Sequence, residues 1–376
     1  MPSASTEQQR PPRLKSLLGF LERDPQNPVL IADAAQAAFD EKAYGTASDL
    51  ILRHPHPLPA ALVNLSGLVA LSEQRYADAA AVFEALKNTG ASDPGLDFNL
   101  AWAYAMMSEW QKALDVLDDR ALSASPHGPS LKIHLMHHLG LFDEALAKGE
   151  ELAERFPDDA ALMGALATLA MDAEKPDLMR AYAERGAKSA EGNTALAFAA
   201  LGDHDPRALA LFDRALATDP NSPRAWIGKG LGMLASGDAV SGAEAIDRGA
   251  AIFGDHVGSW IASGWAHFAA GDRARARQSF ERAMEADPNF SECHGGIAVM
   301  DFMDGNIEGA QRACDVALRL DKKSFGGALA KVLLLDKSGN KQAAQRVRDI
   351  AFAMPLGMHG ETLAQLLAKA GGKLSR

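Results

Sequence analysis

The chain has 376 residues, of which 47% are hydrophobic but only 6% aromatic, so its apolar content is mainly small and aliphatic. Such a composition favours close helix packing over sheets. The length exceeds one ordinary globular core, so we expect several domains or one elongated array. The 38 basic and 49 acidic residues give a net charge of −11 without a basic stripe, which argues against nucleic acid or an anionic membrane as a partner.

The sequence shows no feature of a membrane or secreted protein. No run approaches the ~18 apolar residues of a membrane span, and the first residues, MPSASTEQQRPPRLK, lack the apolar stretch of a secretory signal. Only two cysteines occur, Cys293 and Cys314, which excludes a disulfide scaffold and fits a reducing compartment. We therefore expect a cytoplasmic protein, and the Ala-, Gly-, Arg- and Asp-rich sequence suggests a bacterial one.

In chain order, the first expected elements are a tail and a single helix. The prolines in residues 1–13 predict a disordered N-terminal tail. Leu14 to Arg23 is expected to form one helix that ends at Asp24-Pro25. Further helical segments follow, in which an aromatic residue stands three positions before an alanine: Tyr44 and Ala47, Tyr76 and Ala79, Trp110 and Ala113, and Phe142 and Ala145.

A fixed spacing becomes obvious between residues 224 and 288. Trp226 and Trp260 are 34 residues apart, and so are Gly230 and Gly264. Small residues allow two helices to approach closely, aromatic residues fill the space between them, and the Pro of Asp287-Pro288 ends a helix at a turn. The best copy contains Trp260, Gly264, Ala276, Phe280, Ala283 and Pro288.

These residues resemble the tetratricopeptide repeat, whose 34-residue unit has Trp, then Gly, then Ala and Phe four apart, then Pro. Continuing the frame in both directions covers residues 14–355 with about ten units. The resemblance implies an all-α fold, a right-handed superhelical solenoid of about ten helix–turn–helix repeats. The units before residue 188 are degenerate, whereas those after it are regular.

The repeat phase breaks near residues 187–193, where a new unit begins about five residues early. We interpret this break either as a soft joint in the array or as a shortened loop without mechanical meaning. It divides the array into an N-terminal block, 14–187, and a C-terminal block, 188–355. Residues 356–376 are expected to provide a capping helix from Glu361 to Ala370 and a tail, although the same helix could instead dock on a partner.

The sequence contains no catalytic motif that we recognise. It has no phosphate-binding Gly-rich loop, no H-E-x-x-H, no C-x-x-C and no G-x-S-x-G. Because the repeats occupy nearly every segment, no room remains for a separate catalytic domain. We therefore expect no enzyme and no cofactor, and a function that depends on the surface of the array.

The resemblance implies that positions 2, 5, 9, 12 and 13 of each unit line a concave groove. Several of these positions carry apolar residues, which indicates a protein or peptide partner. Close superhelical winding could instead bury the same residues. The predicted groove residues are Phe39, Leu68, Leu71, Phe98, Trp102 and Met106 in the first half, and Ile227, Leu231, Leu234, Ile261, Trp265, Phe268, Val299, Phe302, Met303 and Leu333 in the second.

One unit places four histidines, His127, His134, His137 and His138, at groove positions. We expect the last three to contact a partner as a polar, partly protonated patch. Since His134 and His138 are four residues apart, they share a helical face and form a weak candidate metal site, with Asp172 of the next unit as a third ligand. Solvated histidines without a role are the remaining alternative.

The function predicted from these observations is a non-catalytic scaffold or adaptor that binds a peptide or helix in its groove. One alternative is a self-assembling structural protein, a homo-oligomer in which the groove takes the helix Glu361–Ala370 of a neighbouring chain. Another is an accessory subunit that holds a metal or small ligand at the histidines.

Overall fold

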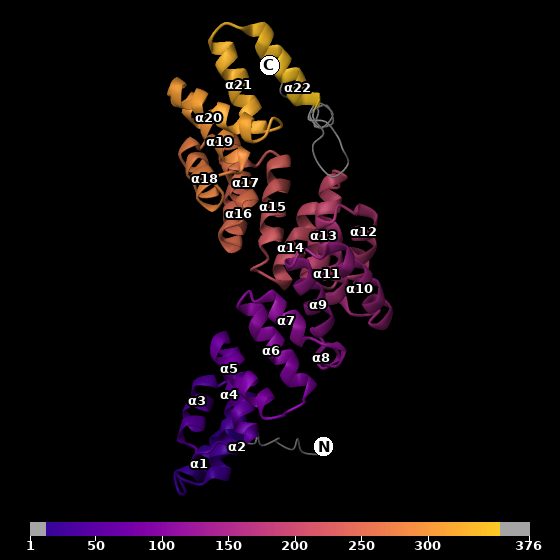
Figure 1. Ribbon diagram of the computed structural model, residues 1–376, viewed down its shortest axis with the longest axis vertical. Helices are drawn as coiled ribbons and strands as arrows, with labels where there is room; N and C mark the ends of the chain where they lie inside the picture. Colours follow the sequence, from indigo (N-terminus) through magenta and orange to yellow (C-terminus); the bar gives the residue numbers. More distant parts are fainter. Residues whose placement is uncertain (1–12, 354–376) are drawn as a thin grey trace, which may run out of the picture. The chain divides into compact units, whose positions relative to one another are not determined.

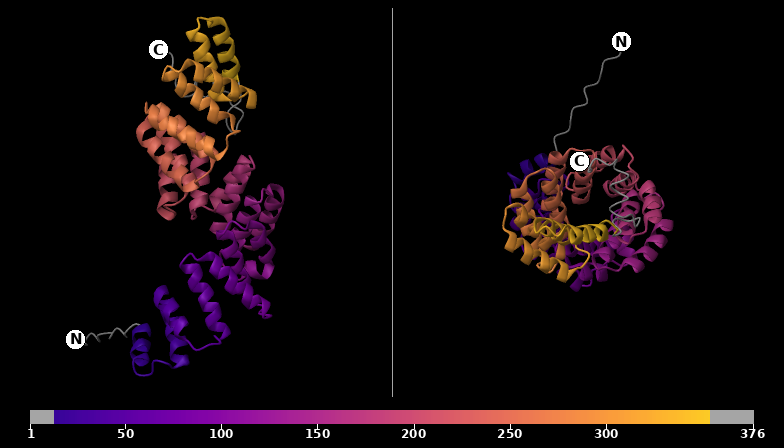
Figure 2. Two further views of the ribbon diagram at one scale, coloured as in Figure 1. Left: turned by 60° about the vertical axis from the view of Figure 1, so that its left-hand side comes forward. Right: turned by 90° about the horizontal axis from the view of Figure 1, so that it is seen from above.

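A computed structural model describes residues 13–353 of the chain, and within this range it contains 22 helices and no strand (Figure 1). The all-α prediction is therefore confirmed for these residues. The chain divides into two compact units, which we call unit 1 (residues 1–162) and unit 2 (residues 163–376). Each unit is built from antiparallel helix pairs that stack beside one another (Figure 2).

Unit 1 contains one single helix followed by four hairpins, with a short helix, Asp119–Ser123, between the third hairpin and the fourth. Its helices are α1 (Arg13–Leu21), α2 (Pro28–Asp40), α3 (Tyr44–Arg53), α4 (Ala60–Ser72), α5 (Tyr76–Asn88), α6 (Pro94–Met106), α7 (Trp110–Val116), α8 (Asp119–Ser123), α9 (Gly128–His138) and α10 (Phe142–Arg155). The single helix expected from residue 14 to 23 is thus α1. The first helix of each hairpin is called helix A and the second helix B.

Unit 2 contains six hairpins, and the division between the units falls near the start of the first of them. Its helices are α11 (Ala160–Asp172), α12 (Pro176–Arg185), α13 (Ala190–Gly202), α14 (Ala208–Thr218), α15 (Pro223–Ala235), α16 (Ala239–Phe253), α17 (Val257–Ala269), α18 (Arg273–Ala286), α19 (Ser291–Met303), α20 (Ile307–Leu320), α21 (Phe325–Lys337) and α22 (Lys341–Ala353). The two units together contain ten described hairpins, as the repeat count predicts.

The turn from helix A to helix B is the same in all ten hairpins. Each turn contains one residue with positive φ, and the N–H of the next residue donates to the carbonyl five residues back, over 2.8 to 3.0 Å. The last four hairpins have glycine there, from Gly237 to Gly339, spaced by 34 residues. Five of the other six have a residue with a side chain at this point: Lys42, Gln74, Ser108, Glu174 and His204.

In two hairpins, α4 with α5 and α17 with α18, the core contains a fully buried phenylalanine of helix B against a glycine of helix A. A Cβ on Gly264 would lie 2.5 Å from the ring of Phe280, and one on Gly67 would lie 2.5 Å from the ring of Phe83. No side chain other than hydrogen therefore fits at these two glycines while the rings keep their places. The hairpin of α4 and α5 in unit 1 thus has the same packing as the hairpin of α17 and α18 in unit 2.

The predicted break in phase at 187–193 falls inside unit 2, where Glu174 and His204 are 30 residues apart. The connection is short because Gly186 and Gly192 are in close contact: a Cβ on Gly192 would lie 2.1 Å from the carbonyl oxygen of Gly186. The amide of Asn193 donates to the carbonyls of Ala187 and Ser189, over 2.9 and 2.8 Å. These contacts favour the shortened-loop interpretation over a soft joint.

Several predictions concern residues outside the described range. The N-terminal tail, apart from Arg13, and the helix Glu361–Ala370 both lie there. The division of the array at residue 187, the terminal cap and a right-handed superhelical path through the whole chain stay predictions.

Candidate functional site

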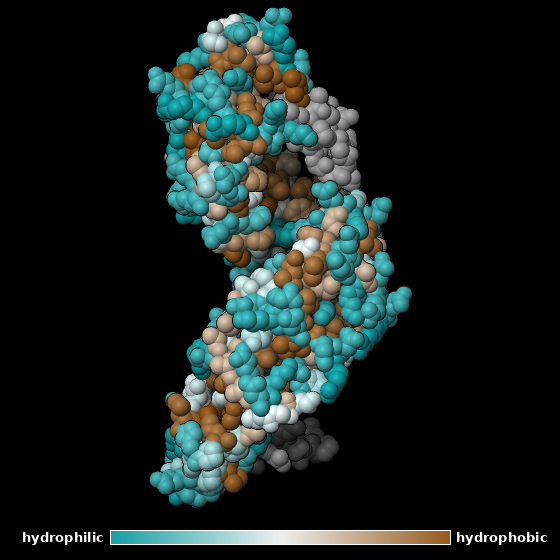
Figure 3. Space-filling view, in the orientation of Figure 1, coloured by the Kyte–Doolittle hydropathy of each residue, from teal (hydrophilic) through white to brown (hydrophobic). Residues whose placement is uncertain are grey.

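The predicted groove positions of helix A are half-buried in most hairpins, whereas the positions between them are buried against helix B. On α17, for example, Trp260 and Gly264 are buried, and Ile261 and Trp265 are partly exposed. The surface formed by these partly exposed side chains on neighbouring A helices of one unit is called the helix-A face below. The space-filling view shows hydrophobic patches within a mostly hydrophilic surface on both units (Figure 3).

In unit 1, α6 presents three predicted groove residues on successive turns. The rings of Phe98 and Trp102 lie 6.1 Å apart, and Met106 is 42% exposed. Trp102 also contacts His127, with ring centroids 6.3 Å apart. Both aromatic rings rest on the core of this unit, as do two predicted residues of α4, Leu68 and Leu71. These side chains give α4 and α6, two neighbouring A helices, a partly exposed apolar area on the same core.

The histidines of α9 are divided between two places. His127 lies against Trp102, whereas the ring of His138 stacks on Trp110 at 4.1 Å, nearly parallel. His137 meets Phe142 edge to face at 5.5 Å. Trp110 and Phe142 are the first residues of helices B, so His137 and His138 lie at the edge formed by the A-to-B turns. His134 is half-buried on α9.

The structure gives no support to a metal site at these histidines. Within residues 13–353 no group of three His, Cys, Asp or Glu side chains is arranged to hold an ion. The carboxylate of Asp172 is instead engaged by Arg224, whose two nitrogens lie 3.0 and 2.6 Å from its oxygens. The chemistry of a bidentate ion pair explains this position without a metal.

In unit 2 the helix-A face is partly filled by its own aromatic residues. The Trp265 ring contacts Phe268 of the same helix at 5.8 Å, Phe280 of α18 at 5.1 Å and Phe325 of α21 at 5.3 Å. Trp265 of α17 thus touches a residue two hairpins further along the chain. The other predicted residues of this face, Ile227, Leu231, Leu234, Ile261, Phe302 and Leu333, are half-buried, and Met303 is 42% exposed.

One predicted groove residue is placed differently from the prediction. Val299 is completely buried in the core of unit 2, in the same cluster as Phe280 and Met300. A partner has no access to a side chain with no exposed surface. The reason is that α21 approaches α19 closely, because both helices have glycines at the contact. A Cβ on Gly295 would lie 2.6 Å from the backbone nitrogen of Gly327.

The same contact also receives a charged cap. Glu292 of α19 accepts hydrogen bonds from the hydroxyl of Ser324 and the backbone N–H of Gly326, over 2.8 and 3.0 Å. A carboxylate at the N-terminus of α21 satisfies donors that the helix leaves unpaired. Glu292, a groove position in the repeat frame, is therefore structural.

Sequence reasoning missed a buried polar network between two helices of unit 2. The carboxylate of Asp247 on α16 accepts from Ser263 over 2.5 Å and from His267 over 2.8 Å, both on α17. The imidazole is 3% exposed. The three residue types suggest a catalytic triad, but here the carboxylate lies between the hydroxyl and the imidazole, whereas a triad requires the imidazole in the middle. The network joins neighbouring hairpins, as Asp213 and Lys229 do over 2.7 Å.

The two cysteines have no sign of reactivity. Cys293 and Cys314 are fully buried, and burial raises the pKa of each thiol to about 11. A thiol with a raised pKa is a weak nucleophile and metal ligand at neutral pH. Both cysteines therefore act as small core residues.

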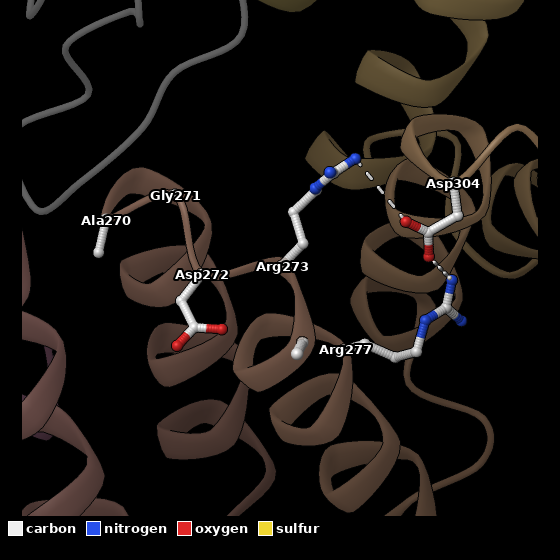
Figure 4. Close-up of a pocket in the computed structure, with 7 residues that line it drawn as sticks. Ala270, Gly271, Asp272, Arg273, Arg277 and Asp304 are labelled. Atoms are coloured by element: carbon white, nitrogen blue, oxygen red, sulfur yellow. Dashed lines mark hydrogen bonds and ion pairs between the residues drawn. The ribbon is translucent and has the colours of Figure 1, made fainter.

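A cavity of unit 2 lies at the turn between α17 and α18 (Figure 4). Arg273 and Arg277 each point toward a different carboxylate oxygen of Asp304, and Arg277 also pairs with Asp301 at 2.8 Å. Neighbouring carboxylates therefore already neutralise both guanidinium groups. This arrangement does not form an anion-binding site.

Only the tryptophans and phenylalanines of the best copies carried a strong signal in the sequence. In the sequence, Trp110 and Phe142 mark the repeat phase, but nothing there indicates that their rings contact His138 and His137. The ion pair of Asp172 with Arg224 had no sequence signal, because its residues are 52 positions apart. No helix in the described part of the chain is long and apolar enough to cross a membrane.

Comparison with known proteins agrees with the repeat. The sequence profile of the tetratricopeptide repeat family matches residues 193–256 and 261–325. A search of curated proteins finds no match. Among solved structures, the chain is similar to one in the crystal structure of the APC/C hetero-tetramer Cut9-Hcn1, with 14% identity over 90% of this chain and 82% of that chain and a TM-score of 0.49.

A TM-score of this size does not establish a common fold, so the assignment depends on the sequence match and on the hairpins themselves. The matched residues form α13 to α20, and the described hairpins outside the match share their turn geometry. The 34-residue spacing of the turns in unit 2 is that of the family. The chain is therefore a tetratricopeptide repeat protein.

Proposed function

We propose that this protein is a non-catalytic scaffold that binds an apolar peptide or helix of a partner protein on its helix-A faces, in a cytoplasmic setting. The observation that carries the proposal is the trio Phe98, Trp102 and Met106 on one side of α6. Core positions of this helix are filled by other residues, so the hairpin does not need these three for its own packing. Partly exposed aromatic and methionine side chains are the usual anchors for a bound peptide.

The face of unit 1 fits this role better than the face of unit 2. In unit 2 the ring of Trp265 is packed between Phe280 and Phe325, and Val299 is buried. A ligand would have to displace these contacts before it gained its own. In unit 1 the ring of Trp102 packs on the core, and part of the ring remains exposed.

The proposal is tested with a displayed library of random peptides selected on the full-length chain. Peptides that depend on this face should bind Trp102→Ala at least about 30-fold more weakly, which corresponds to about 2 kcal/mol for an anchor residue. Selected peptides that bind Trp102→Ala as well as the original chain would place the site elsewhere.

A matched pair of methionine variants controls for general effects. Met106 and Met303 are both 42% exposed and both end a helix A, but they belong to different units. Met106→Ala should weaken the selected peptides, whereas Met303→Ala should leave their affinity unchanged. Circular dichroism of both variants checks that the helices remain folded.

A further inference from the structure

The charge of the protein is concentrated in unit 1. Residues 13–162 contain 12 basic and 22 acidic side chains, a net charge of −10, whereas residues 163–353 contain 22 basic and 25 acidic ones, a net charge of −3. The apolar area of α4 and α6 thus lies on the strongly acidic unit. Since a field of this kind attracts ligands of opposite charge, it constrains the partner.

The acidic residues also surround one edge of the helix-A face. The A-to-B turns of unit 1 all lie at this edge, where Met106 ends α6. Near these turns are three basic residues, Lys42, Arg75 and Lys112. The acidic residues at the same turns are more numerous: Asp40, Glu41, Glu73, Glu109, Asp143 and Glu144.

Ion pairs within the turns leave this excess in place. Arg75 lies 2.8 Å from Glu73 and 2.7 Å from Asp78, and Lys112 lies 3.3 Å from Glu109. Each of these cations is thus shared with acids of its own hairpin. A partner would meet an apolar area next to an edge with net negative charge.

We infer that the partner segment bound by the helix-A face of unit 1 is a basic amphipathic peptide, with apolar residues for Phe98, Trp102 and Met106 and lysine or arginine for the acidic edge. This inference rests on the proposed function and adds the charge of the ligand to it. Acidic peptides would be repelled by the same edge. Because exposed charges are screened within about 10 Å at 0.1 M salt, the preference should weaken as salt increases.

The test uses two synthetic helical peptides of about 14 residues, one of leucine and lysine and one with glutamate in place of each lysine. Binding of each labelled peptide to the full-length chain is measured by fluorescence anisotropy at about 0.05 and 0.3 M salt. At the lower salt concentration, the lysine peptide should bind at least about tenfold more tightly than the glutamate peptide. Trp102→Ala should weaken it, since attraction by charge alone would not depend on that ring.

Charge variants test the edge itself. The double variant Glu73→Gln with Glu109→Gln should weaken the lysine peptide about three- to tenfold. The matched control, Glu281→Gln with Glu308→Gln, removes two exposed carboxylates from α18 and α20 of unit 2 and should leave binding unchanged. An equal loss in both double variants would mean that only the total charge matters, and the inference would be wrong.

The remaining outcomes distinguish a failure of this inference from a failure of the proposed function on which it rests. If both peptides bind equally and both depend on Trp102, the face binds peptides without a charge preference, and only the inference fails. If neither peptide shows binding that depends on Trp102, and the library yields none, the proposed function fails as well. Self-association of the chain that is lost in Trp102→Ala, or tighter peptide binding after removal of residues 354–376, would identify the chain itself as the occupant and overturn a separate basic partner.

Discussion

The guanidinium of Arg224 and the carboxylate of Asp172 form two parallel hydrogen bonds that join α15 to α11, with the hairpin of α13 and α14 between them in sequence. In a solenoid each repeat mainly contacts its neighbours. This ion pair and the contact of Trp265 with Phe325 both skip a helix A in the described part of unit 2. Both fix the position of a repeat relative to the second one along the chain.

Removal of the ion pair should therefore loosen α11 more than it lowers global stability. The two side chains are 36% and 25% exposed, so Arg224→Gln should cost only about 1 kcal/mol. In this variant, the rate of hydrogen exchange should increase more in α11 than in α17. Arg180→Gln provides the control, because Arg180 pairs with Asp203 of the next hairpin only and at higher exposure. Equal exchange in both variants would contradict a role in joining distant repeats.

The second skipping contact should show energetic coupling. Trp265→Ala and Phe325→Ala remove opposite sides of an edge-to-face pair, so a double-mutant cycle should give about 0.5–1.5 kcal/mol. Trp265→Ala alone should cost about 3 kcal/mol, because the ring also packs on the buried Phe280. Urea unfolding of the four proteins provides the measurement. A coupling of zero would show that the rings are neighbours without mutual stabilisation.

The A-to-B turns allow stability to be changed in both directions. Gln74 has φ of 61° and Gly271 has φ of 81° at the equivalent point of their hairpins. A side chain is unfavourable in the left-handed region, so Gln74→Gly should stabilise the chain by about 0.5–1 kcal/mol and Gly271→Ala should destabilise it by about 1 kcal/mol. Thermal unfolding would measure both. Destabilisation by Gln74→Gly would mean that the glutamine side chain makes contacts that outweigh its backbone strain.

The stability of unit 2 should decrease at mildly acidic pH because of His256. Burial, and then the nearby charge of Arg224, lower the pKa of this imidazole. Its Nδ1 accepts the N–H of Ser259 at the start of α17, which also requires the neutral ring. Since the unfolded chain then binds the proton more readily, stability is lost as the pH falls below the unfolded value of about 6.5.

The comparison uses His256→Asn, whose side chain is able to cap the helix without titrating. The difference in unfolding free energy between the two proteins should shift in favour of the variant between about pH 7 and 5. The other groups near this ring are Asp172, which favours the charged form, and Phe253, which contacts it at 4.9 Å. A difference independent of pH would show that His256 does not contribute to acid destabilisation.

The sequence was sufficient to predict the repeat and its core, because Trp260, Gly264 and Phe280 have roles that only a few residue types fill. It was less informative about the helix-A face. The same frame position holds the partly exposed Trp265 and the buried Val299, since exposure there depends on how closely the next A helix approaches. That approach is set by glycines of two different hairpins, Gly295 and Gly326, and no single repeat contains this information.

The turn geometry also explains where the repeat signature fades. In four of the first five turns a side chain occupies the left-handed position, and at each of them the hydrogen bond across the turn is the same as at glycine. Each such residue costs on the order of 1 kcal/mol of stability. The hairpin bears this cost together with the neighbouring hairpins that pack against it. An array of stacked hairpins thus tolerates single changes at the typical positions of the repeat. The repeat remains recognisable from its backbone where its consensus residues are absent.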